Sequence, residues 1–418
     1  MTEAGTLREL REAAGASSVL EHESLGVDGA NVALTLAPSS RDDLAATLAV
    51  CTRHELPLLV RGGGTRLGVG NRPRPVEAWL STAALEPCCE VDADEGVARV
   101  AAATPLRELA TAAIEAGWRS PLEASGPLAT LGGSLAIGSP GPRALGFGPP
   151  RRTVLGLEVV LASGERTRCG SRVVKNVSGY DLAKLYVGSL GTLGVLTEAW
   201  LRLGPRPEAE RTLSAQVGER GVELARRAAR RPGARAVALV DGRFVERSPA
   251  DEAPDVLLVD LAGDAPVVDQ TETWLRSEAD VSPRPDAIDW LQALQEEPGS
   301  GALHFRASSV PSRLGPLRER LHQAGAGVVL HPGLGQAWAF FELEHHDAGL
   351  VDDAWCAVRR ALDPASGAHA VLEQAPSWAK VGRDVFDARP ATLPLMRALK
   401  ERFDPAGILN PGRFAGGL

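Results

Sequence analysis

Three glycine-dense stretches are the residues of this sequence best suited to binding a phosphorylated ligand. The first covers residues 61–70 and follows an apolar run typical of a buried strand; the others cover 129–136 and 188–197. Glycine has no Cβ atom, so it lets backbone N–H groups converge on an anion and approach a phosphate closely. The spacing fits neither the G-x-G-x-x-G nor the G-x-x-x-x-G-K-[ST] phosphate loop. Three such stretches indicate an extended ligand, with tight strand connections as the alternative.

Few residues elsewhere have types and spacing suited to acid–base or metal chemistry. His304 and Arg306 alternate with apolar residues along a predicted strand. Such a basic pair could face a pocket and bind a carboxylate, so both are candidates for catalysis, with surface exposure as the alternative. His345, His346 and Asp347 are consecutive, and adjacent residues of a strand point to opposite faces. We therefore expect no metal site there.

Hydrophobic periodicity predicts the elements that position these residues. A capping box at residues 40–43 begins one helix, and Thr104-Pro105 begins another, which Gly117 ends. A long glycine-rich connection follows at 120–150. Strands are predicted at 56–60, 97–102, 154–162, 166–169, 236–240, 256–261, 302–307 and 337–343, and further helices at 266–279, 311–324 and 349–362.

The composition bounds the class of protein. The chain has 418 residues, which is enough for two domains, and 44% of them are hydrophobic. A net charge of −8 argues against a nucleic-acid partner. The chain has neither an apolar run able to span a bilayer nor an apolar signal region in its first thirty residues, so we expect a cytoplasmic location. Five cysteines without a C-x-x-C pair support neither a disulfide framework nor an iron–sulfur cluster.

Specific strings make the chain resemble a known family of flavoproteins. These are RGGGTRLGVG at 61–70, VLGLEVVLASGE at 154–165, VVKNVSGYDLAKLYVGSLGTLGVLTEAWLRL at 173–203 and DPAGILNPGRF at 404–414. Residues 30–206 resemble the FAD-binding domain of the vanillyl-alcohol-oxidase-like (PCMH-type) superfamily, and the fourth quarter of this stretch resembles most the FAD-binding E subunit of bacterial glycolate oxidase. The resemblance covers roughly half of the chain.

The resemblance implies a fold of class α+β. Residues 1–206 would form a two-lobed PCMH-type FAD-binding domain with its core at 30–206. Residues 207–390 would form an α+β cap domain, and 391–418 a C-terminal segment that returns to the flavin site.

The resemblance also implies which residues bind FAD. The loop at 61–66 would hold the pyrophosphate, residues 130–133 would run along the ribityl chain and flavin, two residues of the third stretch would face the adenine, and the closing Asn-Pro would sit near the isoalloxazine. The implied contacts are Arg61, Gly62, Gly63, Gly64, Thr65, Arg66, Thr130, Leu131, Gly132, Gly133, Gly194, Val195 and Asn410. For Asn410, a turn at the chain end is the alternative.

Two further features bear on the cofactor. The family's covalent members use His or Cys in these loops, whereas this chain has Thr65 after its glycines, which implies non-covalent FAD. Gly138 stands where the E subunit usually has Asn, which puts one polar cofactor contact in doubt. The matching residues Lys175-Asn176 and 180–184 either contact a ligand or support a helix, and support is favoured.

The implied function is that of an FAD-binding subunit of a glycolate oxidase or 2-hydroxyacid dehydrogenase complex. Its substrate would be glycolate or D-lactate, and its partners a homologous catalytic FAD subunit and an iron–sulfur subunit. Any membrane association would be made through a partner rather than by direct insertion. Two alternatives stay open, namely a non-catalytic assembly or electron-relay subunit and a stand-alone FAD-linked oxidase.

Overall fold

The chain divides into two compact units. The computed structural model describes residues 4–172, 181–246, 253–296, 302–343, 345–362, 367–387 and 391–418. The first unit comprises Met1–Ser139, Pro149–Pro205 and Lys380–Leu418, and the second comprises Pro140–Gly148 and Arg206–Ala379. The domain boundaries at 206 and 390 stay predictions. In the structure the chain returns to the first unit at Lys380.

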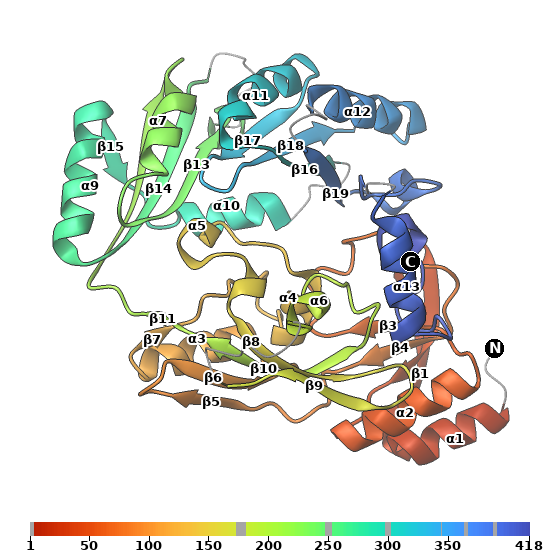
Figure 1. Cartoon of the computed structure of the whole chain (residues 1–418). Coiled ribbons are helices and arrows are strands. Elements are labelled where there is room, and N and C mark those ends of the chain that lie inside the picture. The colour runs from red at the N-terminus through yellow and green to blue at the C-terminus, as the bar shows by residue number, and fades with distance from the viewer. Residues whose placement is uncertain are drawn as a thin grey trace. The chain divides into compact units, whose positions relative to one another are not determined.

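The first unit contains a four-stranded sheet that carries the first glycine stretch at the end of a strand. Its order is β1 (Val19–Val27), β2 (Ala30–Leu36), β4 (Ala78–Ser81) and β3 (Leu58–Arg61), with β4 parallel to both of its neighbours. Helices α1 (Ala4–Ala14) and α2 (Arg41–Arg53) lie side by side in Figure 1 and share an apolar core with this sheet. Ser40 accepts the N–H of Asp43 at 3.0 Å, so the predicted cap of α2 is confirmed.

A second sheet of the first unit has one apolar and one polar face. Its order is β5 (Cys89–Asp92), β6 (Val97–Ala101), β10 (Val195–Arg202), β8 (Val154–Val160) and β9 (Arg166–Gly170), and all neighbours are antiparallel. The apolar face shares a core with helices α3 (Leu106–Glu115), α4 (Leu131–Ile137) and α6 (Ala183–Tyr186). Side chains alternate along a strand, so the charged residues of the same strands lie on the opposite face. Strands β7 (Trp118–Arg119) and β11 (Gly204–Pro205) pair separately, and α13 (Leu393–Phe403) belongs to the C-terminal segment.

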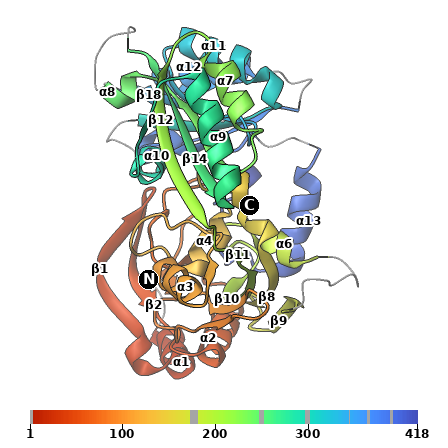
Figure 2. The ribbon, with the colours of Figure 1, turned by 90° about the vertical axis from the view of Figure 1, so that its left-hand side faces the viewer.

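The described part of the second unit is built on one eight-stranded antiparallel sheet. Its strands, in order, are β15 (Val281–Pro283), β12 (Ala209–Val217), β14 (Asp255–Gly263), β13 (Ala234–Val240), β17 (Gly327–His331), β18 (Gln336–Glu342), β16 (Ala302–Ser308) and β19 (His369–Gln374). Its helices are α5 (Ala144–Phe147), α7 (Gly221–Ala228), α8 (Arg243–Glu246), α9 (Ala265–Glu278), α10 (Ala287–Glu296), α11 (Leu314–Gln323) and α12 (Ala348–Ala361). Helix α7 packs on β13 and β14, and α9 packs on β12 and β14 (Figure 2). The predicted α+β class is confirmed.

Candidate functional site

The loop after β3 presents unbonded backbone donors. Within the part of the chain that the structure describes, the N–H groups of Gly62, Gly63, Gly64 and Thr65 donate no hydrogen bond. Gly64 has φ of 77°, a left-handed conformation that suits glycine. Arg61 adds a positive charge, and its buried Nε also has no partner among the described residues. Four adjacent N–H groups beside a guanidinium form a donor set that fits a phosphate.

The first glycine loop lies directly against the second. A Cβ atom built on Gly63 would lie 1.6 Å from the carbonyl oxygen of Leu128, and one on Gly62 would lie 2.5 Å from Oγ1 of Thr130. These two glycines are therefore required by the contact between the loops themselves. The structure brings 61–66 and 126–133 together, as a shared ligand would need.

The second stretch is a helix rather than the expected glycine loop. Thr130 caps α4 by accepting the N–H of Gly133 at 3.4 Å. The N–H groups of Leu131 and Gly132 donate to Thr104 and Ala102, at 3.0 and 2.9 Å. These N–H groups are thus used within the protein, and the predicted contacts of 130–133 with FAD stay a prediction. The sequence signal for this helix is a Thr cap followed by Leu131 and Leu135 on one helical face.

The predicted adenine contacts lie where the third stretch enters the second sheet. Val195 is the first residue of β10, is buried, and pairs with Val160 of β8. A Cβ atom on Gly194 would lie 2.5 Å from Cγ1 of Val159. Close packing against β8 therefore explains the glycine at 194, and contact of either residue with adenine stays a prediction.

Asn410 joins the first and third glycine stretches. Its Oδ1 accepts the N–H of Val60 at 2.7 Å, and its Nδ2 donates to the carbonyl of Leu190 at 2.6 Å. Its own N–H donates to Leu58 of β3 at 2.9 Å, and its φ is 45°. The side chain therefore holds the start of the first loop in place. Its predicted position near the isoalloxazine stays a prediction.

Gly138 is required by a close backbone crossing. It ends α4 with φ of 65°, and a Cβ atom there would lie 2.8 Å from both Cα and N of Gly188. An Asn at this position would displace the third glycine stretch, so the departure from the E-subunit pattern follows from this crossing. Lys175, Asn176 and Tyr180 lie outside the described residues, while Lys184 and Asp181 form an ion pair at 2.8 Å in which both side chains are exposed.

The two candidate catalytic residues lie in the second unit, and their side chains already contact neighbouring side chains. His304 is buried against the ring of Phe340, 4.7 Å away, and burial lowers its pKa from 6.5 to about 4. Arg306 is paired with Glu373 at 2.7 Å. The alternative of surface exposure is wrong for His304, because the strand face that carries it forms part of the core.

The residues 345–347 are not on a strand, because β18 ends at Glu342. The ring of His346 stacks on Trp378, and Asp347 caps α12 by accepting the N–H of Gly349 at 2.7 Å. Over the described ranges, no group of three or more His, Cys, Asp or Glu side chains could hold a metal ion. In the same ranges, no helix is long and apolar enough to cross a bilayer.

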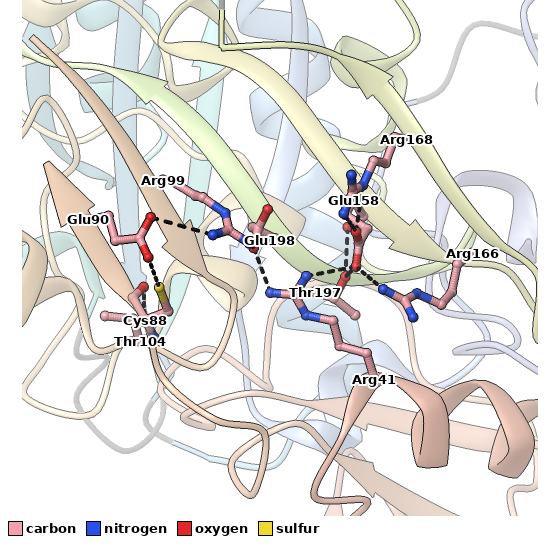
Figure 3. Close-up of polar contacts among 10 residues, drawn as sticks. All are labelled: Arg41, Cys88, Glu90, Arg99, Thr104, Glu158, Arg166, Arg168, Thr197 and Glu198. Atoms are coloured by element: carbon pink, nitrogen blue, oxygen red, sulfur yellow. Dashed lines mark hydrogen bonds and ion pairs between the residues drawn. The ribbon is translucent and has the colours of Figure 1, made fainter. Parts of the chain in front are cut away.

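A charged network on the polar face of the second sheet was not predicted from the sequence (Figure 3). Arg41, the first residue of α2, contacts Glu158 at 3.0 Å and Glu198 at 2.6 Å. Arg168 bonds to Glu158 and Arg99 to Glu198, each within 2.8 Å. Burial alone would raise the pKa of Glu158, but the Arg168 hydrogen bond and the Arg41 charge bring it below its ordinary value. These carboxylates are neutralised by arginines, so the network supports the fold rather than catalysis.

Comparison with known proteins assigns the class. Residues 32–170 match the family described as the FAD binding domain, and residues 386–414 match the C-terminal domain of FAD linked oxidases. The structure of p-cresol methylhydroxylase with bound substrate aligns with a TM-score of 0.71 and 15% identity, over 98% of this chain and 96% of that one. The chain is therefore a flavoprotein with the PCMH-type FAD-binding fold, and FAD is its cofactor. The unbonded donors of the first loop fit the phosphates of that group.

Curated relatives agree on an FAD-linked oxidoreductase. Glycolate oxidase subunit GlcD of Bacillus subtilis is 37% identical over 43% of this chain and 38% of its own length. Glycolate oxidase subunit GlcE of Escherichia coli is 37% identical over 38% of this chain and 46% of its own length. The match therefore spans less than half of either relative. Mitochondrial D-2-hydroxyglutarate dehydrogenase of Bos taurus is 28% identical over 90% of this chain and 75% of its own length.

Proposed function

We propose that the chain is the FAD-binding subunit of a glycolate oxidase or related 2-hydroxyacid dehydrogenase complex. In this role it takes part in oxidising glycolate, or D-lactate, to the 2-oxoacid, and electrons pass through its flavin. The observation that carries the proposal is the similarity of about two fifths of the chain to two different glycolate oxidase subunits, over 43% of it for one and 38% for the other. Its partners would be a homologous catalytic FAD subunit and an iron–sulfur subunit. The complex would be cytoplasmic, with any membrane contact made through a partner.

The first glycine loop supplies cofactor binding in this proposal. The N–H groups of residues 62–65 and the guanidinium of Arg61 would hold the negative charge of the FAD pyrophosphate. Arg66, at the end of the same loop, would add a second cation. FAD, when bound, accepts the hydride from the hydroxyacid.

The remaining chemistry is assigned to a partner subunit. Oxidation of a 2-hydroxyacid also needs a base for the hydroxyl proton and a cation for the carboxylate. His304 is packed in the core with a pKa of about 4, which suits a neutral core residue better than a base working near pH 7. Arg306 already neutralises Glu373. We therefore assign neither role to these two residues. A chain that lacks both groups is also consistent with a purely assembly or electron-relay subunit.

A stand-alone dehydrogenase is the second candidate function. It is favoured by the match to D-2-hydroxyglutarate dehydrogenase, which covers 90% of the chain and therefore extends over both units. In that case the base and the carboxylate-binding cation belong to this chain, and the acid could be larger than glycolate.

Steady-state oxidation with an artificial electron acceptor separates these functions. The chain is assayed alone and after co-expression with its genomic neighbours, with glycolate, D-lactate and D-2-hydroxyglutarate as substrates. The subunit proposal predicts slow turnover alone and a large gain on assembly. Full activity of the lone chain would refute it in favour of the stand-alone enzyme, and a complex whose activity does not depend on this subunit's flavin would favour the assembly role.

A further inference from the structure

The last part of the first unit, Lys380–Leu418, holds the first glycine loop from both sides. At the start of the loop, the side chain of Asn410 accepts the N–H of Val60. Beyond the glycines, Arg413 donates to the carbonyls of Leu67, Val69 and Asn71, and Lys380 donates to the carbonyl of Gly68. The donors lie more than 300 residues from their acceptors along the chain, yet all belong to the first unit.

The two cations share one buried carboxylate. Lys380 contacts Asp28 at 3.0 Å and Arg413 contacts it at 2.9 Å. The side chains of Lys380, Asp28 and Arg413 are 0%, 6% and 9% exposed, so water cannot replace these bonds. Burial lowers the pKa of Lys380 despite the charge of Asp28. With both cations protonated, Lys380, Arg413 and Asp28 carry a formal charge of +1, and the loop carbonyls solvate it.

The backbone of the C-terminal segment also runs along this loop. The N–H of Asn71 donates to the carbonyl of Arg413 at 3.0 Å, and the N–H of Arg74 donates to the carbonyl of Pro411 at 2.9 Å. A Cβ atom on Gly70 would lie 2.7 Å from the carbonyl oxygen of Arg413. The segment thus fixes the part of the loop that follows the free N–H groups, while Asn410 fixes the part that precedes them.

We propose that Lys380 and Arg413, which share Asp28 as their ion-pair partner, are positioning residues that hold the 61–71 loop in its FAD-binding conformation without touching the cofactor. The proposal rests on the assignment of residues 62–65 to the FAD pyrophosphate. A loop already held in its binding conformation loses no further conformational entropy when the ligand binds. If only a fraction of the molecules have the loop in that conformation, the apparent affinity falls in proportion to that fraction. FAD affinity should therefore depend on residues far from the free N–H groups.

The test measures FAD affinity of the full-length apoprotein by quenching of FAD fluorescence. We expect Arg413→Met and Lys380→Met each to raise the Kd about tenfold or more. A rise of this size corresponds to a loop that adopts its FAD-binding conformation in about a tenth of the molecules or fewer. Asp28→Asn should have the largest effect, because it leaves two buried cations without a carboxylate. Asp28→Asn combined with Lys380→Met restores the excess of one positive charge, so this double variant should bind FAD more tightly than Asp28→Asn alone. Arg276→Met, which removes an exposed cation of α9 paired with Glu272, is the matched control and should keep the wild-type Kd.

Two further measurements keep the outcomes apart. Hydrogen exchange of apo Arg413→Met should be faster in peptides of the 61–71 loop and unchanged in β8, which a general loss of stability would not produce. Arg413→Lys keeps the charge and should recover part of the affinity. Folded Arg413→Met and Lys380→Met proteins with Kd values within twofold of wild type would overturn the inference. Wild-type protein that does not bind FAD would instead overturn the function. Gly63→Ala with full FAD affinity would overturn the assignment of the loop, and with it the inference, but not the function.

Discussion

Glu158 and Glu198 lie directly opposite each other on β8 and β10, and the guanidinium of Arg41 bonds to both. Two buried carboxylates side by side would repel each other strongly without a shared cation. Arg41 is the first residue of α2, which packs on the four-stranded sheet. Its contacts therefore connect that lobe to the second sheet. The two lobes of the flavin-binding unit are thus joined by charge as well as by their apolar core.

Arg41→Met should lower the free energy of unfolding by about 2 kcal/mol, since it leaves each carboxylate with fewer cations in a buried place. Urea unfolding followed by tryptophan fluorescence measures this change. Arg53→Met removes an exposed arginine near the end of the same helix, paired with Glu9, and should change stability by less than about 0.5 kcal/mol. Equal effects of the two substitutions would contradict the role of Arg41.

The second unit should lose stability as the pH falls below about 6.5. Burial lowers the pKa of both His304 and His331 from 6.5 to about 4, so each is neutral in the folded protein and takes up a proton on unfolding at lower pH. Their stabilising effect is complete above pH 6.5 and is lost between pH 6.5 and 4, at about 1.4 kcal/mol per pH unit for each residue. Urea unfolding at several pH values measures the slope.

The histidine assignment has a matched pair of variants. His304→Phe should make the pH slope shallower, because one of the two titrating groups is gone. His369→Gln, which changes an exposed histidine of β19, should leave the slope unchanged. A slope that His304→Phe does not alter would show that other groups cause the acid sensitivity.

Gly63→Ala should deplete the bound flavin sharply. The added methyl group would meet the carbonyl oxygen of Leu128 and push the first two glycine loops apart. Gly68→Ala is the control in the same loop, because a Cβ atom there has nothing within 4 Å. The ratio of flavin to protein absorbance after purification measures both. If Gly63→Ala retained all its FAD, the cofactor would not depend on this contact.

Gly138→Asn should also reduce flavin content and stability, although Asn restores the residue usual in the E subunit. The substitution places a Cβ atom against the backbone of Gly188. Gly407 has the same φ of 65° with open space around it, so Gly407→Asn tests the cost of the left-handed conformation alone. Thermal unfolding of the two variants distinguishes steric overlap from backbone strain. Similar melting temperatures would mean that the crossing at Gly138 adapts easily.

Local patterns predicted most single elements. The cap at Ser40, the strand before the first glycine loop, the hairpin of β8 and β9 and the helices α9, α11 and α12 all have clear periodicity or capping signals. Helix α4 was missed because its two glycines are poor helix formers, and tertiary bonds to Ala102 and Thr104 help to hold its first turn.

Long-range charge contacts could not be predicted. The sequence drew attention to Lys175 and Lys184, whereas the structure buries Lys380 and half-buries Lys400. Lys400 donates to the carbonyls of Thr192 and Leu409, so it too ties the C-terminal segment to a glycine stretch. No spacing rule connects residues that are hundreds of positions apart, and the network around Arg41 was missed for the same reason.

The central claim is that this chain binds FAD without a covalent bond, through the loop at 61–66. The most direct measurement is the flavin content of the purified protein before and after heat denaturation. We expect a yellow protein that releases its FAD into the supernatant, identified by its absorbance and fluorescence. Flavin that stays with the precipitate would contradict non-covalent binding, and a colourless protein that cannot be reconstituted with FAD would contradict the claim altogether.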